Sequence, residues 1–424
     1  MSVNTLVDKL KSYSDEYWDF TGYRDRKALI KYPAMMVAPM QEQLLQDILE
    51  FDTNIRNILD PFVGSGTVLA AGAKHNLTTY GIDINPLAIL ITRVRLEGIP
   101  PIKIRESIAQ LKSHLSLFLG NIEMHYFNNI DKWFRSDVIA DLSTIRKAIV
   151  QEKDINIRRF FWVCFADTVR KYSNTRSTTF KLHVKEETKI KSMKNDCIEY
   201  FVNKISTLYS DYVNDQETII TNLYTGNATD ILRNFESNSI DLICTSPPYG
   251  DNHTTVTYGQ YSILPLLWID VNDLDSFDMS MLDKFTAIDR MSLGGHYNLN
   301  NFSVEIDFED LISNLSLEKA KKVKFFINDY CKVFVELARV LKKDKKLVLT
   351  LGNRRVDNKE FPFDVLNDRL AEKYGLVEEA VLTRNIQGKR MPIRVSNIPN
   401  HGAVKSMSKE YVKIYRKVLE GRSE

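Results

Sequence analysis

A short polar turn after an apolar run holds the residues best suited to chemistry. Residues 245–250 read Thr-Ser-Pro-Pro-Tyr-Gly, and the preceding residues 240–244 read Ile-Asp-Leu-Ile-Cys, which predicts a short buried strand. The strand must end at Pro247 and Pro248, because proline has no N–H for a sheet hydrogen bond. The turn is therefore stiff and lies at the carboxyl end of a strand, where open α/β sheets bind ligands. Alone, it would be interpreted as an ordinary proline-rich turn, since such tetrapeptides are common.

A second polar turn lies far upstream, between another predicted strand and a helix. Residues 57–67 read Asn-Ile-Leu-Asp-Pro-Phe-Val-Gly-Ser-Gly-Thr, and a further strand over 80–82 ends at Asp83. Gly64 and Gly66 permit a tight turn and close approach of the backbone to a ligand. No Gly-Lys-Ser/Thr sequence follows, which argues against a nucleotide triphosphatase. Asp60 and Asp83 would each pass for a turn acid alone, but together they flank the glycine turn at two strand ends.

The two turns together resemble the motifs of the S-adenosylmethionine-dependent DNA amino-methyltransferases of the cytosine-N4 and adenine-N6 type. Residues 60–67 match the cofactor loop of that family, and residues 245–249 match its catalytic loop. The resemblance implies a Rossmann-like, class I methyltransferase of the α/β class. The strand, turn and helix pattern over residues 55–97 independently favours a doubly wound, mostly parallel sheet.

The resemblance also implies a set of residues that bind S-adenosylmethionine. Asp60 would hold the amino group of the cofactor with Phe62 packed beside it, and Asp83 would accept hydrogen bonds from the ribose hydroxyls. A Tyr-Pro-Ala element would cover the methionine end, although Met36 stands where the family often has a lysine. Asn227 would read the adenine, with Asp230 as the alternative. The expected cofactor-binding residues are Tyr32, Pro33, Asp60, Phe62, Gly64, Gly66, Thr67, Asp83 and Asn227.

The catalytic loop would present an exocyclic base amine to the methyl donor. Such an amine is a poor nucleophile, because its lone pair is delocalised into the ring. The Ser246 hydroxyl and the Pro247 carbonyl would accept its two hydrogens and stabilise developing positive charge. Pro248 stiffens the loop, and Tyr249 would stack on a base extruded from the duplex. A serine at the head of this loop is associated in the family mostly with cytosine N4, so we favour that amine over adenine N6.

Three parts of the chain are expected to position these loops. Residues 1–100 form an N-terminal arm and the cofactor half of the catalytic domain. Residues 101–218 form a helical insertion, with helices over 104–119, 137–150, 157–172 and 189–212. Residues 219–424 form the catalytic half, with a loop insertion at about 270–320, a helix over 322–341 and strands over 346–353 and 410–415. Residues 251–260 are polar and are expected to close over a bound base.

The insertion carries an excess of basic residues, which we interpret as a DNA-binding, target-recognition surface. The basic side chains outnumber nearby Asp167, Glu186 and Glu187 and alternate with small polar residues that can bind phosphate. A solvated helix face is the simpler interpretation of such a run. The basic residues are Arg158, Arg159, Arg170, Lys171, Arg176, Lys181, Lys185, Lys189, Lys191 and Lys194. The candidate DNA-binding residues are Arg170, Lys171, Asn174, Arg176 and Lys181.

Composition limits the remaining possibilities. The net charge of +2 does not identify a partner, so nucleic acid would have to bind a local basic surface. Cys164, Cys197, Cys244 and Cys331 lie far apart, which favours buried free thiols over a metal site. The amino terminus lacks a secretory pattern, and no apolar run is long enough to span a bilayer. We therefore expect a cytoplasmic protein that binds double-stranded DNA, with a cognate restriction endonuclease as a possible partner and without a metal.

Two other functions remain open from the sequence. An RNA base methyltransferase would have a similar pair of loops, but that class usually has an added RNA-binding module and an aspartate or asparagine before the prolines. A catalytically silent DNA-binding or specificity subunit would keep the fold without turnover. Gly64, Gly66, Asp83 and residues 246–249 are all intact, which favours an enzyme.

Overall fold

The computed structural model describes residues 4–418 except residues 15, 24–27, 121, 214–219, 251–255, 296–305, 387–393, 396–403 and 406–408. At 394–395 and 404–405 it describes the backbone alone. The expected base-closing run therefore lies outside the described residues over 251–255. The same is true of residues 296–305 in the expected loop insertion.

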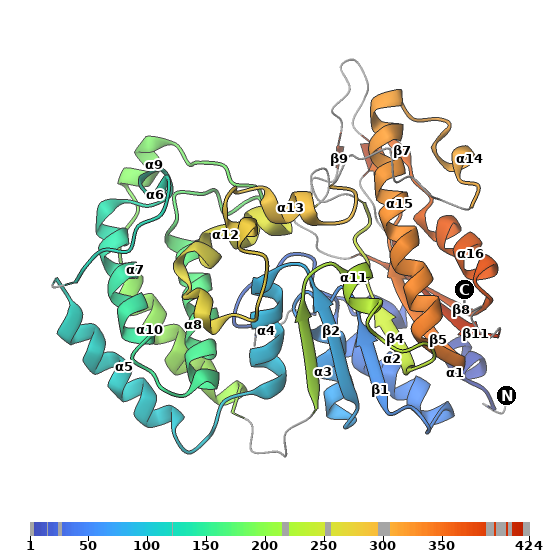
Figure 1. The fold of residues 1–424 in the computed structure, drawn as a ribbon, viewed down its shortest axis with the longest axis horizontal. Coiled ribbons are helices and arrows are strands. Elements are labelled where there is room, and N and C mark those ends of the chain that lie inside the picture. The colour runs from blue at the N-terminus through green and yellow to red at the C-terminus, as the bar shows by residue number, and fades with distance from the viewer. Residues whose placement is uncertain are drawn as a thin grey trace.

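A seven-stranded sheet forms the centre of the molecule (Figure 1). Its order is β3-β2-β1-β4-β5-β11-β8, and β11 is antiparallel to both of its neighbours while the other pairs are parallel. The strands are β1 (Asn57–Asp60), β2 (Thr78–Asp83), β3 (Thr221–Thr225), β4 (Ile240–Thr245), β5 (Leu341–Leu351), β8 (Leu376–Asn385) and β11 (Lys409–Lys417). The predicted doubly wound, mostly parallel sheet is confirmed.

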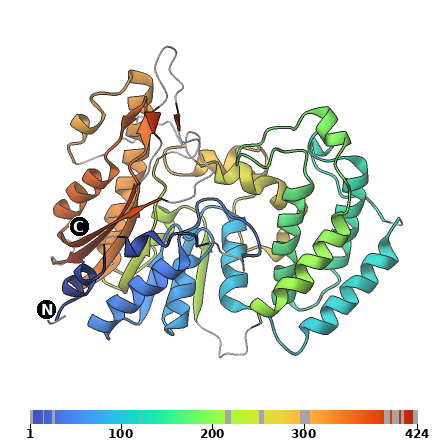
Figure 2. The ribbon, with the colours of Figure 1, turned by 180° about the vertical axis from the view of Figure 1, so that it is seen from behind.

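Helices cover both faces of this sheet, as a largely parallel sheet requires. Successive side chains of a strand point to opposite faces, so Ile58 and Leu242 pack with α1, α2 and α3, whereas Leu59 and Ile243 pack with α11, α15 and α16. Helices α11 and α15 lie in front of the sheet in Figure 1, and α2 lies in front in Figure 2. The covering helices are α1 (Leu6–Ser12), α2 (Ala38–Phe51), α3 (Thr67–Lys74), α4 (Pro86–Glu97), α11 (Ala228–Leu232), α15 (Leu317–Val340) and α16 (Phe363–Lys373).

Beside the β3 edge lies a helical segment, in which most of the predicted helices are confirmed. Its helices are α5 (Ile104–Phe118), α6 (Ile130–Trp133), α7 (Ser136–Ile149), α8 (Ile155–Tyr172), α9 (Glu187–Lys191) and α10 (Cys197–Leu208). The prediction of one continuous helix over 189–212 is wrong, because the helix is interrupted between α9 and α10. The Arg135 guanidinium donates hydrogen bonds to the carbonyl of Ile190 at 3.0 Å and to that of Met193. The Asn195 side chain accepts from the Cys197 N–H at 3.3 Å.

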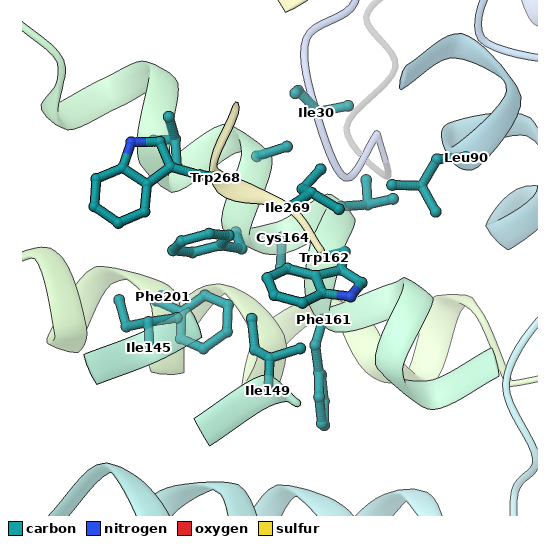
Figure 3. Packing of buried hydrophobic residues seen from close by; sticks show 14 of the residues in the cluster. Ile30, Leu90, Ile145, Ile149, Phe161, Trp162, Cys164, Phe201, Trp268 and Ile269 are labelled. Carbon is teal, nitrogen blue, oxygen red and sulfur yellow. The ribbon is translucent and has the colours of Figure 1, made fainter. Parts of the chain in front are cut away.

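The helical segment shares one hydrophobic core with the sheet domain. Figure 3 shows Trp162 and Cys164 of α8 grouped with Trp268 and Ile269, which end helix α12 (Tyr258–Trp268), and with Leu90 of α4. These side chains are almost fully buried. The segment is therefore built onto α4 and α12, and α12 begins shortly after the catalytic loop.

Two further parts of the chain differ from the sequence expectations. Residues 258–260 form the start of α12 rather than a flexible run, because the Asp289 carboxylate accepts from the N–H groups of Gly259 at 2.8 Å and Gln260 at 3.0 Å. Strand β8 was not predicted, since Glu378, Glu379 and Arg384 interrupt its apolar residues. Within the expected loop at 270–320 lie short helices, among them α13 (Ala287–Met291) and α14 (Glu309–Ile312).

Candidate active site

The glycine turn and the double-proline turn meet at one edge of the sheet. Strands β1 and β4 are neighbours, with Leu59 opposite Ile243, and both end at the same edge. The Thr245 hydroxyl, at the end of β4, donates a 2.6 Å hydrogen bond to Oδ1 of Asp60, at the end of β1. A single hydrogen bond thus joins two loops that are 185 positions apart in the sequence. The expectation that they share one edge of the sheet is confirmed.

The glycine turn has the conformation that its sequence predicts. Gly64 and Gly66 have φ values of +51° and +75°, which residues other than glycine rarely adopt. A Cβ at Gly66 would lie 2.8 Å from the Thr92 side chain of α4, so this position has no room for one. Thr67 begins α3 and is buried. The backbone of the turn therefore lies just beyond the carboxyl end of β1.

Asp60 is a fully buried carboxyl with one oxygen left without a partner. Its Oδ1 accepts from Thr245 and from the Phe62 N–H at 3.1 Å, whereas Oδ2 has no hydrogen-bond partner among the described residues. Burial raises the pKa of Asp60 to about 7, although the two hydrogen bonds oppose that rise. A buried acceptor of this kind is completed by a cationic donor, so Asp60 fits the ammonium group that the resemblance assigns to it.

Asp83 connects the glycine turn to the start of α4. Its Oδ2 accepts from the Gly64 N–H and its Oδ1 from the Asn85 N–H, both at 2.9 Å. Burial raises the pKa of Asp83 to about 6, while the backbone hydrogen bonds lower it. Each carboxylate oxygen can accept more than one hydrogen bond. Asp83 can therefore still accept hydrogen bonds from the ribose hydroxyls, as expected from the resemblance.

An aromatic wall stands beside the glycine turn. Buried Tyr32 accepts a 2.9 Å hydrogen bond from the Asn85 side chain, and its ring lies next to Gly64. The ring also stacks on Tyr258 of α12, with centroids 5.9 Å apart. Neighbouring Pro33 is buried as well. The sequence pointed to Tyr32 and Pro33 but missed Tyr258, because that residue follows the catalytic loop and belongs to no motif.

Asn227 lies at the third strand end of the same edge. It is exposed and caps α11, with its side-chain oxygen accepting from the Thr229 N–H at 2.9 Å. The adjacent Gly226 donates its N–H to the Asp83 carbonyl at 2.9 Å, which places Asn227 beside the β2 end. The alternative residue, Asp230, is exposed and pairs with Arg233 at 3.3 Å. Of the two, Asn227 lies nearer to the glycine turn along the sheet edge.

Side chains of β11 and β8 hold the double-proline turn in place. Half-buried Ser246 lies with its hydroxyl 3.2 Å from the Tyr249 hydroxyl, which in turn donates to the Glu410 carboxylate of β11 at 3.4 Å. Glu410 also pairs with Arg384 of β8 at 3.5 Å. Burial and the nearby Glu410 raise the pKa of Tyr249 well above its usual value, so this phenol keeps its proton. The sequence missed Glu410 and Arg384, since neither lies in a motif.

The prolines and glycine of this loop are enclosed. Pro247 and Gly250 are buried and Pro248 is half-buried. Gly250 has a φ of +155°, and a Cβ built there would lie 2.4 Å from the guanidinium of Arg354. Arg354 follows β5, so a third strand of the sheet also contributes a side chain to the surroundings of the loop. The sequence analysis missed Arg354, and its position just after a predicted strand is the signal that could have identified it.

Two of the five candidate DNA-binding residues are engaged inside the protein. The Arg170 guanidinium lies 4.0 Å from the centre of the Tyr261 ring and donates to the Tyr261 carbonyl at 3.0 Å, and burial lowers its pKa. Asn174 is buried, and its side chain donates to the Lys132 carbonyl at 3.2 Å. Arg170 and Asn174 thus have partners inside the protein, and a phosphate contact by them stays a prediction.

The other three candidates are exposed. Lys171 extends over the Tyr200 ring, 3.4 Å from its centre. Arg176 and Lys181 lie on a hairpin over residues 174–185, which is closed by the Arg176 N–H to His183 carbonyl bond at 2.8 Å. The hairpin contacts α12, where Leu182 donates its N–H to the Gln260 side chain at 3.1 Å. The two cations therefore lie on a segment attached to the helix that follows the catalytic loop.

The structure also bears on metals, membranes and thiols. Over the described ranges, His, Cys, Asp and Glu side chains form no group of three or more that could hold a metal ion. None of the helices in that part of the chain is long and apolar enough to cross a bilayer. All four cysteines are free and buried, as the sequence predicts.

The strand order, the single antiparallel strand β11 and the two turns at one edge define a Rossmann-like class I methyltransferase fold. No family model matches the chain. The type II methyltransferase M.MvaI from Kocuria varians is 29% identical over 93% of this chain and 94% of its own length. M.AvaI from Anabaena variabilis is 24% identical over 83% and 79%. The chain is thus similar along almost its whole length to type II DNA methyltransferases.

Solved structures show a weaker likeness. A DNA modification methylase from Thermus thermophilus, complexed with S-adenosyl-L-methionine, is 18% identical over 47% of this chain and 56% of its own, with a TM-score of 0.23. The rRNA methyltransferase AviRa from Streptomyces viridochromogenes is 9% identical over 92% and 90%, with a TM-score of 0.31. These TM-scores are too low to support an argument about function.

Proposed function

We propose that this chain is a site-specific DNA methyltransferase that uses S-adenosylmethionine to methylate N4 of a cytosine flipped out of the duplex. The observation that carries the proposal is the Thr245–Asp60 hydrogen bond, which puts the head of the catalytic loop beside an acid suited to the cofactor. The similarity to a type II methyltransferase over 93% of the chain supports the same activity. A place in a restriction-modification system of the cytoplasm, beside a cognate endonuclease, belongs to the same proposal.

The cofactor site in this proposal is built from the ends of β1, β2 and β3. Asp60 holds the amino group through Oδ2, Asp83 accepts from the ribose hydroxyls, and Tyr32 covers the methionine end over the glycine turn. Phe62 packs beside Asp60 at the amino group, and Asn227 reads the adenine. When bound, S-adenosylmethionine supplies a methyl group on a positively charged sulfur, an electrophile that needs no metal.

The chain's part in the reaction is to hold and polarise the amine. The Ser246 hydroxyl oxygen and the Pro247 carbonyl accept the two amine hydrogens, which directs the nitrogen lone pair away from the loop. Their dipoles are fixed before the base arrives, because Pro247 is buried and the loop is held by Thr245 and Tyr249. The ring of Tyr249 lies beside these acceptors and offers a face to an extruded base.

DNA binding is proposed for the exposed cations of the helical segment. Arg176 and Lys181, which lie on the hairpin over 174–185, contact DNA phosphates. Lys171, at the end of α8, contributes a third such contact. Arg170 and Asn174 support that surface from inside, through Tyr261 and Lys132. Binding of this kind positions the duplex and weakens as salt increases.

One experiment tests the target atom directly. The protein is incubated with labelled S-adenosylmethionine and plasmid DNA, and the DNA is digested to nucleosides for mass spectrometry. We expect N4-methylcytosine. N6-methyladenine would correct the base, label only in added RNA would replace the substrate, and cofactor binding without transfer would indicate a silent subunit.

A further inference from the structure

A chain of hydrogen-bonding groups runs from the catalytic loop into the C-terminal strands. It connects the Ser246 hydroxyl, the Tyr249 hydroxyl at 3.2 Å and the Glu410 carboxylate at 3.4 Å from that phenol oxygen. Glu410 pairs across strands with Arg384, both in sheet register and through a 3.5 Å ion pair. The side chains of Glu410 and Arg384 are only 14% and 9% exposed, so solvent screens their interaction little.

The chemistry of these groups fixes the direction of the chain. A carboxylate accepts hydrogen bonds and cannot donate one, whereas a phenol carries a single proton. A hydrogen bond to a charged acceptor is stronger than one to a neutral hydroxyl, so the Tyr249 proton is directed to Glu410. The phenol oxygen then accepts from Ser246. The Ser246 proton is thereby taken up, and the hydroxyl oxygen presents its remaining lone pairs to the space above the loop.

We propose that Glu410 acts through Tyr249 as a positioning residue, which keeps Ser246 oriented as a hydrogen-bond acceptor for the target amine. This inference rests on the proposed methyltransferase function. Without the chain, the Ser246 hydroxyl is free to rotate, and its proton would meet the amine hydrogens instead of its lone pairs.

Arg384 completes the arrangement from the neighbouring strand. Its guanidinium faces Glu410 and also lies 3.8 Å from the Met40 sulfur of α2. The carboxylate is therefore held between the phenol and a cation whose position is fixed by packing. Strands β8 and β11 thus reach the catalytic loop, although they follow it by more than a hundred positions in the sequence.

The test compares Tyr249→Phe, Glu410→Gln and the double variant in single-turnover methylation of plasmid DNA with labelled cofactor. Phenylalanine keeps the aromatic face and removes the hydroxyl, so a role in stacking alone predicts the wild-type rate. We expect each single variant to lose about tenfold in rate, the factor for one ordinary hydrogen bond. The double variant should lose no more than Tyr249→Phe alone, because both changes break the same chain. Cofactor and DNA affinities should remain near those of the wild type.

The matched control is Glu379→Gln. Glu379 lies on β8 and pairs with Arg416 of β11 at 2.5 Å and with Lys346 of β5 at 3.6 Å, so this change removes an acid and its ion pairs from the same part of the sheet. It should leave the rate unchanged. A wild-type rate in Glu410→Gln, or losses that multiply in the double variant, would overturn the inference. A wild-type protein that transfers no methyl group to DNA would instead overturn the proposed function.

Discussion

The sheet edge at β1 and β4 and the helical segment from α5 to α10 both carry charged residues for which the sequence predicts a function, but they use charge differently. At the edge, Asp60 is buried with one oxygen unpartnered among the described residues, so that oxygen can still accept a hydrogen bond. In the helical segment, Arg158 pairs with Asp273 at 2.5 Å and Arg159 with Glu97 at 3.7 Å. These two arginines of the basic run therefore hold the segment to the rest of the chain.

The largest effect is expected at the edge, for Ser246→Ala. Loss of one pre-organised polar contact to the reacting group should lower the methyl-transfer rate about 10²- to 10³-fold. Cofactor affinity, measured by calorimetry, should be retained. Ser292→Ala is the control, because that buried hydroxyl caps the end of α13, where it donates to the Ile288 carbonyl. Loss of cofactor affinity together with the rate would point to misfolding.

A smaller effect at the same edge concerns pH. The pKa of Asp60 is raised from 3.8 to about 7, so its cation-binding, ionised form increases as the pH rises through that value. Cofactor affinity should therefore increase about tenfold between pH 6 and pH 8. Stability of the free protein has the opposite sign, since a raised folded-state pKa contributes stability that is lost as pH rises through about 7.

The variant Asp60→Asn separates this residue from other titrating groups. Asparagine keeps the shape without the charge, so the affinity should be lower, and its remaining change between pH 6 and pH 8 should be no more than about twofold, from Asp83 with its pKa of about 6. Calorimetric titration at pH 6, 7 and 8 measures both. A wild-type affinity that does not change over this range would show that Asp60 does not pair with the cofactor's ammonium group.

In the helical segment, we expect removal of exposed cations to lower the affinity for DNA. The double variant Arg176→Ala, Lys181→Ala should lower the slope of log affinity against log salt by about 2, about one for each phosphate contact. The control Lys191→Ala removes a cation that is 74% exposed and pairs with Glu187 on α9. An unchanged slope in the double variant would move the DNA surface elsewhere.

The smallest effect on DNA is expected for Arg170→Met. Its guanidinium binds the Tyr261 ring and carbonyl, so removal should lower the free energy of unfolding by about 1 to 3 kcal/mol and leave the salt slope unchanged. Thermal unfolding and salt titration measure the two quantities. Lys171→Met, at the neighbouring exposed position, should show the reverse pattern. A reduced slope in Arg170→Met would restore its predicted contact with DNA.

The sequence predicted the edge well because its signals are local. Two glycines, two prolines and acids at strand ends dictate backbone conformation within a few residues, and parallel strands of a doubly wound sheet end at one edge. The meeting of Asp60 with Thr245 followed from that topology. The helices of the insertion were likewise predicted from periodicity, apart from the break that Arg135 imposes between α9 and α10.

What the sequence could not show is the partner of each charged side chain. Arg158 and Arg159 looked like an excess of charge because their acids, Asp273 and Glu97, are far away along the chain. Arg170 has an aromatic partner, which no count of acids reveals. Glu410 was missed for the same reason, since its importance depends on a phenol 161 positions earlier. Pairing through space decides whether a charge is available to a ligand.

The hydrogen bond between Thr245 and Asp60 has a consequence for how the two substrates influence each other. In the proposed site, Asp60 binds the donor and Thr245 ends the strand that carries the acceptor loop, so the same bond would contribute to the free energy of both sites. Any energetic effect that donor binding exerts on the loop must be matched by an equal effect of the loop's ligand on the donor, because thermodynamic coupling is reciprocal. Order of binding and product discrimination in this protein would then both depend on one threonine hydroxyl.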